Sequence, residues 1–150
     1  MKAKERVRTA MRRGVPDRVP VVPQICTPHA IRALGLDYEA TILETIRRPE
    51  LLNERDYRCA REYGVDGMRA WTLPAPLDVT KADGKWYGVD PKTGQRLGEV
   101  DFHGGGGILR PESPVIRTEE DIERIPVPTP AEIIKSGRMD SIKRILRDAG

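Results

Sequence analysis

The sequence predicts an α/β fold in which helices connect two parallel strands. A largely apolar run from Arg18 to Ile25 predicts the first strand, Val65 to Trp71 predict the second, and a helical pattern that opens at Pro49 lies between them. Apolar runs without alternation are typical of strands covered on both faces, as in parallel sheets. The order strand, helix, strand implies a right-handed crossover and hence a parallel pair.

Composition places the chain among globular proteins and limits the size of its core. Of its 150 residues, 33% are charged, 38% are hydrophobic and 5% are aromatic, which is typical of a soluble globular sequence rather than a membrane or collagen-like one. The 14 glycines and 13 prolines predict a large share of turns and irregular connections. Because only two tryptophans, four tyrosines and one phenylalanine are present to fill an interior, we expect one domain at most, and an incomplete one.

The charge pattern argues against nucleic-acid and membrane partners. The 26 lysines and arginines exceed the 23 aspartates and glutamates by a net charge of +3, and their one cluster, near the N-terminus, fits the solvated face of a helix better than a phosphate-binding stripe. No run of 18 apolar residues is present, so no membrane span is expected. Met1 leads directly into charged residues, which predicts a cytoplasmic protein. Cys26 and Cys59 lack zinc-type spacing, which predicts reduced thiols.

Local patterns predict several helices and an inserted β-hairpin. Apolar residues at helical spacing and capping residues define the helices, and Thr118 with Asp121 three residues later forms a capping-box-like start. The prolines at 126, 128 and 130 predict an extended loop. The expected helices cover residues 4–13, 28–34, 38–46, 49–63, 119–125 and 139–149, and the expected hairpin strands cover 85–89 and 96–100.

Four segments occur in an order that is specific as a series. They follow a short basic helix and are residues 16–21 (PDRVPV), 62–67 (EYGVDG), 116–121 (IRTEED) and 125–128 (IPVP). This series resembles the N-terminal part of the uroporphyrinogen decarboxylase superfamily, which also contains methyltransferases that act between methylated corrinoids and thiols. The resemblance covers nearly the whole chain. It implies a (β/α)8 TIM barrel, a fold of at least about 200 residues, of which this chain would hold an incomplete N-terminal portion with an inserted β-hairpin.

Two positions separate the branches of this superfamily. Porphyrinogen decarboxylases carry an Arg-Gln-Ala-Gly-Arg segment after the first strand, whose guanidiniums clamp substrate carboxylates; alignment on Pro20 and Val21 places Ile25 and His29 at those arginines. Their second strand ends in Phe-Ser-Asp, and Leu73 lies at the position of that acid. The resemblance therefore implies a methyltransferase acting between a methylated corrinoid and a thiol.

The methyltransferase-like branch implies zinc and a corrinoid as cofactors of the complete enzyme. Zinc held by His and Cys ligands makes a bound thiol a thiolate at neutral pH. Those ligands lie in later strands of the family and match no residue here, so we expect this chain alone to bind neither cofactor and to be inactive. The implied substrate is a small molecule or a corrinoid protein.

Candidate substrate-binding residues lie where the two expected strands end, because barrel active sites form at the C-terminal ends of strands. Cys26 and His29 form a Cys-x-x-His pair, which offers two ligands where zinc requires three or four; helix capping or packing is the alternative. Trp71 is expected either in the core or stacked on a flat ligand. The full candidate set is Gln24, Cys26, His29, Arg69, Trp71 and Thr72.

Arg69 has the most unusual position of these candidates, because it places a charge within an apolar strand. A buried guanidinium without a partner is costly. Arg69 is therefore expected either to bind a substrate anion or to form a structural pair with Asp66, Asp78 or Asp101.

Two alternative functions stay open. A uroporphyrinogen decarboxylase of porphyrin biosynthesis with an unusual clamp would use Arg18, Arg32 and Arg69, because its substrate's many carboxylates need several cations. A non-catalytic truncated module would instead assemble with a partner, or form a homo-oligomer through its unfinished sheet, because an open parallel edge exposes backbone donors and acceptors.

Overall fold

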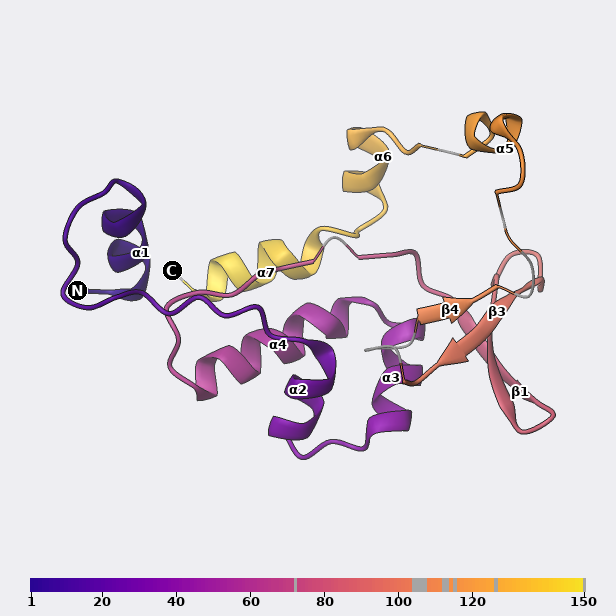
Figure 1. The fold of residues 1–150 in the computed structure, drawn as a ribbon, viewed down its shortest axis with the longest axis horizontal. Helices are drawn as coiled ribbons and strands as arrows, with labels where there is room; N and C mark the ends of the chain where they lie inside the picture. Colours follow the sequence, from indigo (N-terminus) through magenta and orange to yellow (C-terminus); the bar gives the residue numbers. More distant parts are fainter. Residues whose placement is uncertain (72, 104–107, 112–113, 115, 126, 150) are drawn as a thin grey trace.

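The computed structural model of this chain describes all of its residues except 72, 104–107, 112–113, 115, 126 and 150. The described residues form four helices, then a four-stranded sheet, then three further helices (Figure 1). The helices are α1 (Ala3–Met11), α2 (Thr27–Ala33), α3 (Tyr38–Arg47), α4 (Glu50–Glu62), α5 (Glu119–Glu123), α6 (Pro130–Lys135) and α7 (Asp140–Asp148). The strands are β1 (Asp78–Ala82), β2 (Lys85–Val89), β3 (Arg96–Asp101) and β4 (Ile108–Arg110).

The sheet is antiparallel throughout, and its strands neighbour one another in chain order, β1-β2-β3-β4. Asp83 and Gly84 connect β1 to β2 with φ values of 50° and 78°, as the two-residue turns of tight hairpins require. The predicted strand pair at 85–89 and 96–100 forms as β2 and β3, but at the centre of this sheet rather than as an insertion. Parallel strands need crossovers of a dozen or more residues, and these strands follow one another too closely for that.

The expected N-terminal portion of a TIM barrel is wrong, because its two parallel strands do not form. Residues 18–25 and the described residues of 65–73 contain no strand. The two segments run side by side, and one backbone hydrogen bond, from the Asp66 N–H to the Val21 carbonyl (2.8 Å), joins them. The prolines at 20 and 23 have no N–H to donate to a ladder, and the Val21 N–H donates to the Asp66 carboxylate instead (2.9 Å). Side-chain contacts thus replace the expected ladder.

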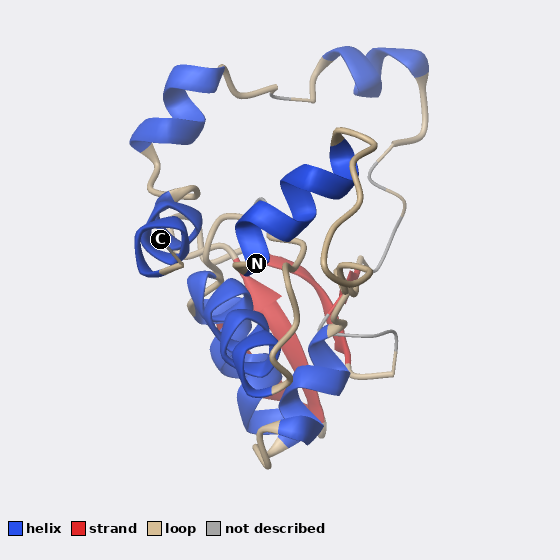
Figure 2. Cartoon of the chain, turned by 90° about the vertical axis from the view of Figure 1, so that its left-hand side faces the viewer, coloured by secondary structure: helices blue, strands red, loops and turns tan. Residues whose placement is uncertain are grey.

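Two small apolar clusters form the core, and α2 contributes to both. Ala30 belongs to a cluster with Ile25, Cys59 and Ala60, against which Val65 and Met68 pack. Ile31, the next residue of α2, belongs to a second cluster at the sheet, with Ile42, Val100, Trp86, Phe102 and Leu109. Figure 2 shows the helices in front of the strands that they cover. The second cluster holds α2 and α3 against the sheet, and the first holds α2 against α4.

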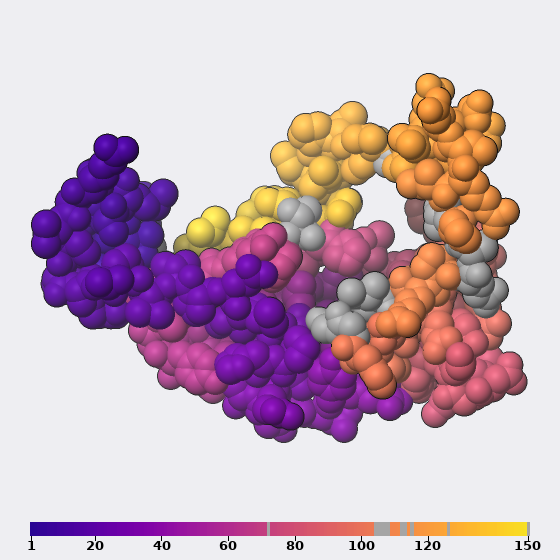
Figure 3. All heavy atoms as spheres, viewed as in Figure 1, coloured from indigo at the N-terminus to yellow at the C-terminus, as the bar shows by residue number. Residues whose placement is uncertain are grey.

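Two parts of the chain extend away from this core. α1 lies at one end of the molecule, and α5 and α6 lie on an arm at the other side (Figures 1 and 3). α7 returns from that arm and packs along α4, where Arg144 forms an ion pair with Glu54 (2.7 Å). No helix in the described residues is both long and apolar enough to cross a membrane.

Capping residues account for the helix that the sequence interpretation did not include. The proline series predicts an extended loop, but Pro130 is the first residue of α6, where proline's missing N–H costs nothing. The Thr129 N–H donates to the Glu132 carboxylate (2.7 Å), and the Glu132 N–H donates to the Thr129 hydroxyl (3.3 Å). At α5, the predicted start is confirmed, because Asp121 accepts the Thr118 N–H (3.0 Å).

Candidate functional site

The candidate residues of the first segment lie on the surface at the start of α2. Gln24 and Cys26 are exposed, and Cys26 immediately precedes the helix. His29 is also exposed, and its Nε2 lies 3.0 Å from the Tyr63 Oη at the end of α4. One hydrogen bond therefore joins the start of α2 to the end of α4, and it occupies one nitrogen of the imidazole.

In the second segment, Arg69 stacks on Trp71. The guanidinium carbon of Arg69 lies 3.8 Å from the centroid of the Trp71 ring, well within the range of a cation–π contact. Arg69 is exposed and Trp71 is half-buried, so no buried guanidinium needs a partner. Thr72, the third candidate of this segment, lies outside the described residues.

The structural pair expected for Arg69 does not form with any described carboxylate. Asp66 is bound by Arg6 and Arg18, and Asp101 is bound by Arg110 (2.5 Å). Arg69 is thus an exposed cation held in place by an aromatic ring, an arrangement that leaves its N–H edge for an anion.

An ion-pair network with a buried centre, Arg6 and Asp66, joins α1 to the two extended segments. Arg6 donates from Nε and Nη2 to the Asp17 carboxylate (2.6 and 2.8 Å) and from Nη1 to Asp66. Arg18 reaches Asp66 with both terminal nitrogens (2.8 and 2.9 Å). The basic helix and the segments 16–21 and 62–67, which carry much of the resemblance, therefore meet at one carboxylate.

The network holds its carboxylates in the charged form. The Asp66 side chain is 1% exposed, and the hydrogen bond from the Val21 N–H, together with Arg6 and Arg18, keeps the pKa of Asp66 below its usual range. Arg6 and the N-terminal ammonium (2.9 Å) lower the pKa of Asp17 in the same way. The hydrogen bonds to Asp17 in turn raise the pKa of Arg6.

A second buried polar cluster ties α4 to the 71–73 segment and to α7. The Asn53 Oδ1 accepts the Trp71 backbone N–H (2.8 Å), and its Nδ2 donates to the Trp71 carbonyl (2.9 Å) and to the Ser141 Oγ (3.1 Å). Asn53 and Ser141 are almost wholly buried. One side-chain amide therefore satisfies the N–H and carbonyl that a neighbouring strand would satisfy in a sheet.

Asp56 lies one turn further along α4 and is a different kind of buried group. It is 1% exposed, and neither carboxylate oxygen has a hydrogen-bond partner among the described residues. Burial raises the pKa of Asp56 to about 6, and the nearby Trp71 side chain and Arg55 charge offset only part of that rise. Because a buried charge without a partner is costly, Asp56 opposes folding at neutral pH.

An apolar groove of about 730 Å³ lies between α1, α4, α7 and the 65–70 segment. Two of its charged residues, Asp66 and Asp148, are acidic, and three, Lys4, Arg8 and Arg61, are basic. Its apolar lining includes Val7 of α1, Val22, Ala60 of α4, Val65, Met68, and Ile142, Ile145 and Leu146 of α7.

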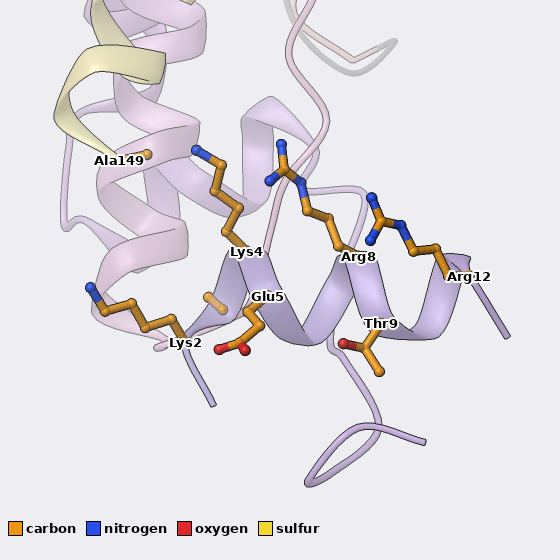
Figure 4. Close-up of a pocket in the computed structure, with 8 residues that line it drawn as sticks. Lys2, Lys4, Glu5, Arg8, Thr9, Arg12 and Ala149 are labelled. Atoms are coloured by element: carbon orange, nitrogen blue, oxygen red, sulfur yellow. The ribbon is translucent and has the colours of Figure 1, made fainter. Parts of the chain in front are cut away.

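A row of basic side chains borders this groove. Lys4 and Arg8 of α1 and Arg12, which directly follows the helix, are spaced four residues apart and point to the same side (Figure 4). Lys4 and Arg8 line both the groove and a second hollow of about 540 Å³ on the other side of the row. We refer to Lys4, Arg8 and Arg12 as the basic row.

The zinc implied by the resemblance does not fit the residues that the structure describes. Within those residues, no three His, Cys, Asp or Glu side chains gather where they would hold a metal ion. Cys26 and His29 would supply two ligands, and zinc requires three or four from a protein.

Comparison with protein-family models, curated proteins and solved structures finds no match to this chain. The resemblance to the uroporphyrinogen decarboxylase superfamily therefore stays a prediction that depends on the sequence segments quoted above.

Sequence reasoning missed three buried polar residues, Asn53, Asp56 and Ser141. Asp56 carries a signal, because it shares the helical stripe of Leu52, Cys59 and Ala60, and a charge on such a stripe indicates a buried carboxylate. Cys59 is fully buried, as that stripe predicts. Asn53 and Ser141 carry no comparable signal, because their burial depends on the docking of α7 on α4.

Proposed function

We propose that this chain is part of an enzyme of the uroporphyrinogen decarboxylase superfamily that transfers a methyl group between a methylated corrinoid and a thiol. The observation that carries the proposal is the meeting of Arg6, Asp17, Arg18 and Asp66 in one ion-pair network around the buried Asp66 carboxylate. These residues come from the basic helix and from two of the four segments that carry the resemblance. Those segments therefore contain residues that bind one another in the folded chain. The proposal covers the reaction only. It does not include the barrel fold, because the described sheet is antiparallel and a barrel portion would be parallel.

Within this proposal, the exposed candidates bind substrate. Arg69, held by Trp71 at 3.8 Å, contacts an anionic group through its N–H edge, as guanidiniums do in bidentate pairs. Gln24, Cys26 and His29 contribute polar contacts at the start of α2. The zinc ligands and the corrinoid site belong to residues outside this chain, and the enzyme acts in the cytoplasm on a small molecule or a corrinoid protein.

The direct test extends the reading frame beyond residue 150 and assays the purified product. We expect about one zinc per chain and transfer of the methyl group from methylcobalamin to a thiol. Arg69→Ala should raise the KM for an anionic thiol at least about tenfold, whereas Arg47→Ala, at an exposed position of α3, should leave it unchanged. A product that neither holds zinc nor consumes methylcobalamin would contradict the proposal, as would a reading frame that ends at residue 150.

The decarboxylase alternative has less support. Of the three arginines that it would use, Arg18 is bound by Asp66 through both terminal nitrogens, which leaves Arg32 and Arg69 for many substrate carboxylates. Conversion of uroporphyrinogen to coproporphyrinogen by the extended product would overturn this ranking.

A non-catalytic assembly module is favoured by a separate observation, the apolar groove beside α1. The open parallel edge that first motivated this alternative is absent from the described sheet, whose edges are the antiparallel strands β1 and β4. The groove offers another surface for a partner. Its apolar and basic lining residues would suit a partner with apolar and acidic side chains.

A further inference from the structure

We propose that the apolar groove binds residues 116–125 of a second copy of this chain, so that two copies associate reciprocally. These residues contain α5 and are called the acidic segment below. The inference concerns assembly and does not depend on methyl transfer, since neither the groove nor the acidic segment includes the candidate substrate-binding residues.

The groove exposes apolar surface that a partner would cover. Leu146 is 67% exposed and Val22 is 52% exposed, although both line a concave surface together with Ile142, Ile145 and Met68. Concave apolar surface rimmed by charged residues is typical of interaction sites. Its dimensions, about 730 Å³, match a short segment rather than a whole domain face.

Charges at the groove select an acidic partner. Lys4, Arg8 and Arg61 are basic, and Arg12 extends the basic row past the groove. Asp66 is already neutralised by Arg6 and Arg18, which leaves Asp148 as the remaining acid of the lining. An acidic segment is therefore attracted, and a basic one repelled.

The acidic segment has the complementary chemistry. Glu119, Glu120 and Glu123 are exposed, and with Asp121 they outnumber the two basic residues of the segment, Arg117 and Arg124, the second of which lies 3.8 Å from Asp121. Ile122 is 57% exposed and Ile125 is 43% exposed, so apolar anchors stand beside these carboxylates. Asp121 is not expected to contact the groove, because its carboxylate already accepts hydrogen bonds from the backbone N–H groups of Arg117 and Thr118.

The acidic segment cannot fill the groove of its own molecule. α5 lies on the arm at one side of the structure, whereas the groove lies beside α1 at the opposite end (Figures 1 and 3). A second copy removes this constraint. In a two-fold arrangement each copy offers its segment and accepts the other's, so that both contacts form twice and the assembly closes.

Sedimentation velocity of the chain over about 1 μM to 1 mM tests the proposal. At about 50 mM salt, the mass should rise from 16.8 kDa towards twice that value. The association should weaken at about 500 mM salt, where charges are screened over a shorter range. A chain that stays monomeric over the whole concentration range at low salt overturns the proposal.

Three variants identify the surfaces, each with a thermal unfolding curve to confirm folding. Arg8→Glu in the basic row and Ile122→Asp in the acidic segment should each raise the dimer Kd at least about tenfold. Arg47→Glu changes the same charge on α3, away from the groove, and should leave the Kd unchanged. Association that is insensitive to Arg8→Glu or to Ile122→Asp overturns the assignment.

A charge exchange separates this contact from other modes of dimer formation. Glu119→Lys/Glu123→Lys should weaken self-association as Arg8→Glu does. When these two proteins are mixed, the altered groove of one faces the altered segment of the other with exchanged charges, and the second contact joins an unaltered groove to an unaltered segment. Both contacts are then complementary, whereas each homodimer has two mismatched contacts, so a mixed dimer should form more tightly than either homodimer. Failure of the mixed dimer to exceed both homodimers would show that another surface mediates association.

Discussion

Arg6 and Asp66, which are 60 residues apart in the chain, form a buried ion pair that holds α1 on the extended 65–71 segment. Arg18 and the Val21 N–H bind the same carboxylate. Since breaking a buried pair leaves a charge without its partner, Arg6 is expected to be the most sensitive cation of α1.

Arg6→Met should lower the urea unfolding midpoint, because it keeps the apolar stem but leaves Asp17 and Asp66 without the guanidinium that joins them. Arg12→Met, at the exposed residue that directly follows α1, is the matched control and should leave the midpoint nearly unchanged. Arg6→Met/Asp66→Asn should lose less than the sum of the two single variants, because the two residues interact. Additive losses would show that the pair contributes nothing of its own.

Acid should destabilise the chain through the same network. The pKa values of Asp17 and Asp66 are lowered in the folded state, first by the Arg6 hydrogen bonds for Asp17 and by the Val21 N–H for Asp66. The unfolded chain therefore binds more protons at low pH, and the stability that these groups contribute is present above about pH 4 and lost as pH falls below it. Urea titrations between pH 5 and pH 2 should show this loss, and Asp66→Asn should reduce its slope.

Asp56 should have the opposite effect between pH 4 and pH 6. Burial raises its pKa to about 6 in the folded state, so the folded chain binds the extra proton, and stability falls as pH rises from about 4 to about 6 by on the order of 2 to 3 kcal/mol. Asp56→Asn should remove this slope and raise stability at pH 7 by about 1 kcal/mol, since an amide carries no charge to bury. Asp140→Asn, at an exposed carboxylate, should leave the slope in place; a wild-type curve that is flat from pH 4 to pH 6 would contradict the raised pKa.

Gly98 on β3 should not tolerate a side chain. A Cβ there would lie 2.5 Å from the Arg110 carbonyl oxygen and 2.9 Å from the Pro111 nitrogen, and these backbone atoms cannot move without disturbing the β3–β4 pairing. Gly98→Ala should cost about 2 to 3 kcal/mol of unfolding free energy. Gly88→Ala meets the side-chain end of Leu109 instead (2.7 Å), which is able to rotate away, so its cost should be smaller. Equal costs would show that β4 is not held at this register.

Arg69 should contribute to recognition and not to stability. Arg69 is exposed, and its guanidinium stacks on the Trp71 ring. Arg69→Met and Arg69→Ala should therefore each change the unfolding free energy by no more than about 1 kcal/mol. A loss of more than about 2 kcal/mol in both would assign Arg69 a structural role. Thermal unfolding of the two variants, beside the KM measured for the extended enzyme, separates these roles.

The sequence alone determined the local structure wherever the signal lies within a few residues. Gly64, with φ near +61°, ends α4 where the glycine predicts; Thr118 and Asp121 begin α5; and Asp83-Gly84 forms the tight turn before β2. These features depend on backbone conformations and caps that neighbouring residues satisfy, so they need no distant contact.

Only the tertiary structure decided what the apolar segments became. The patterns of 18–25 and 65–71 fit buried parallel strands, but pairing requires backbone partners from elsewhere in the chain. Here the Asp66 carboxylate takes the Val21 N–H, and the Asn53 amide takes both polar groups of the Trp71 backbone. Burial of Asp56 and exposure of Arg69 follow from the same packing, because a periodic pattern specifies which face a residue shares but not which partner covers that face.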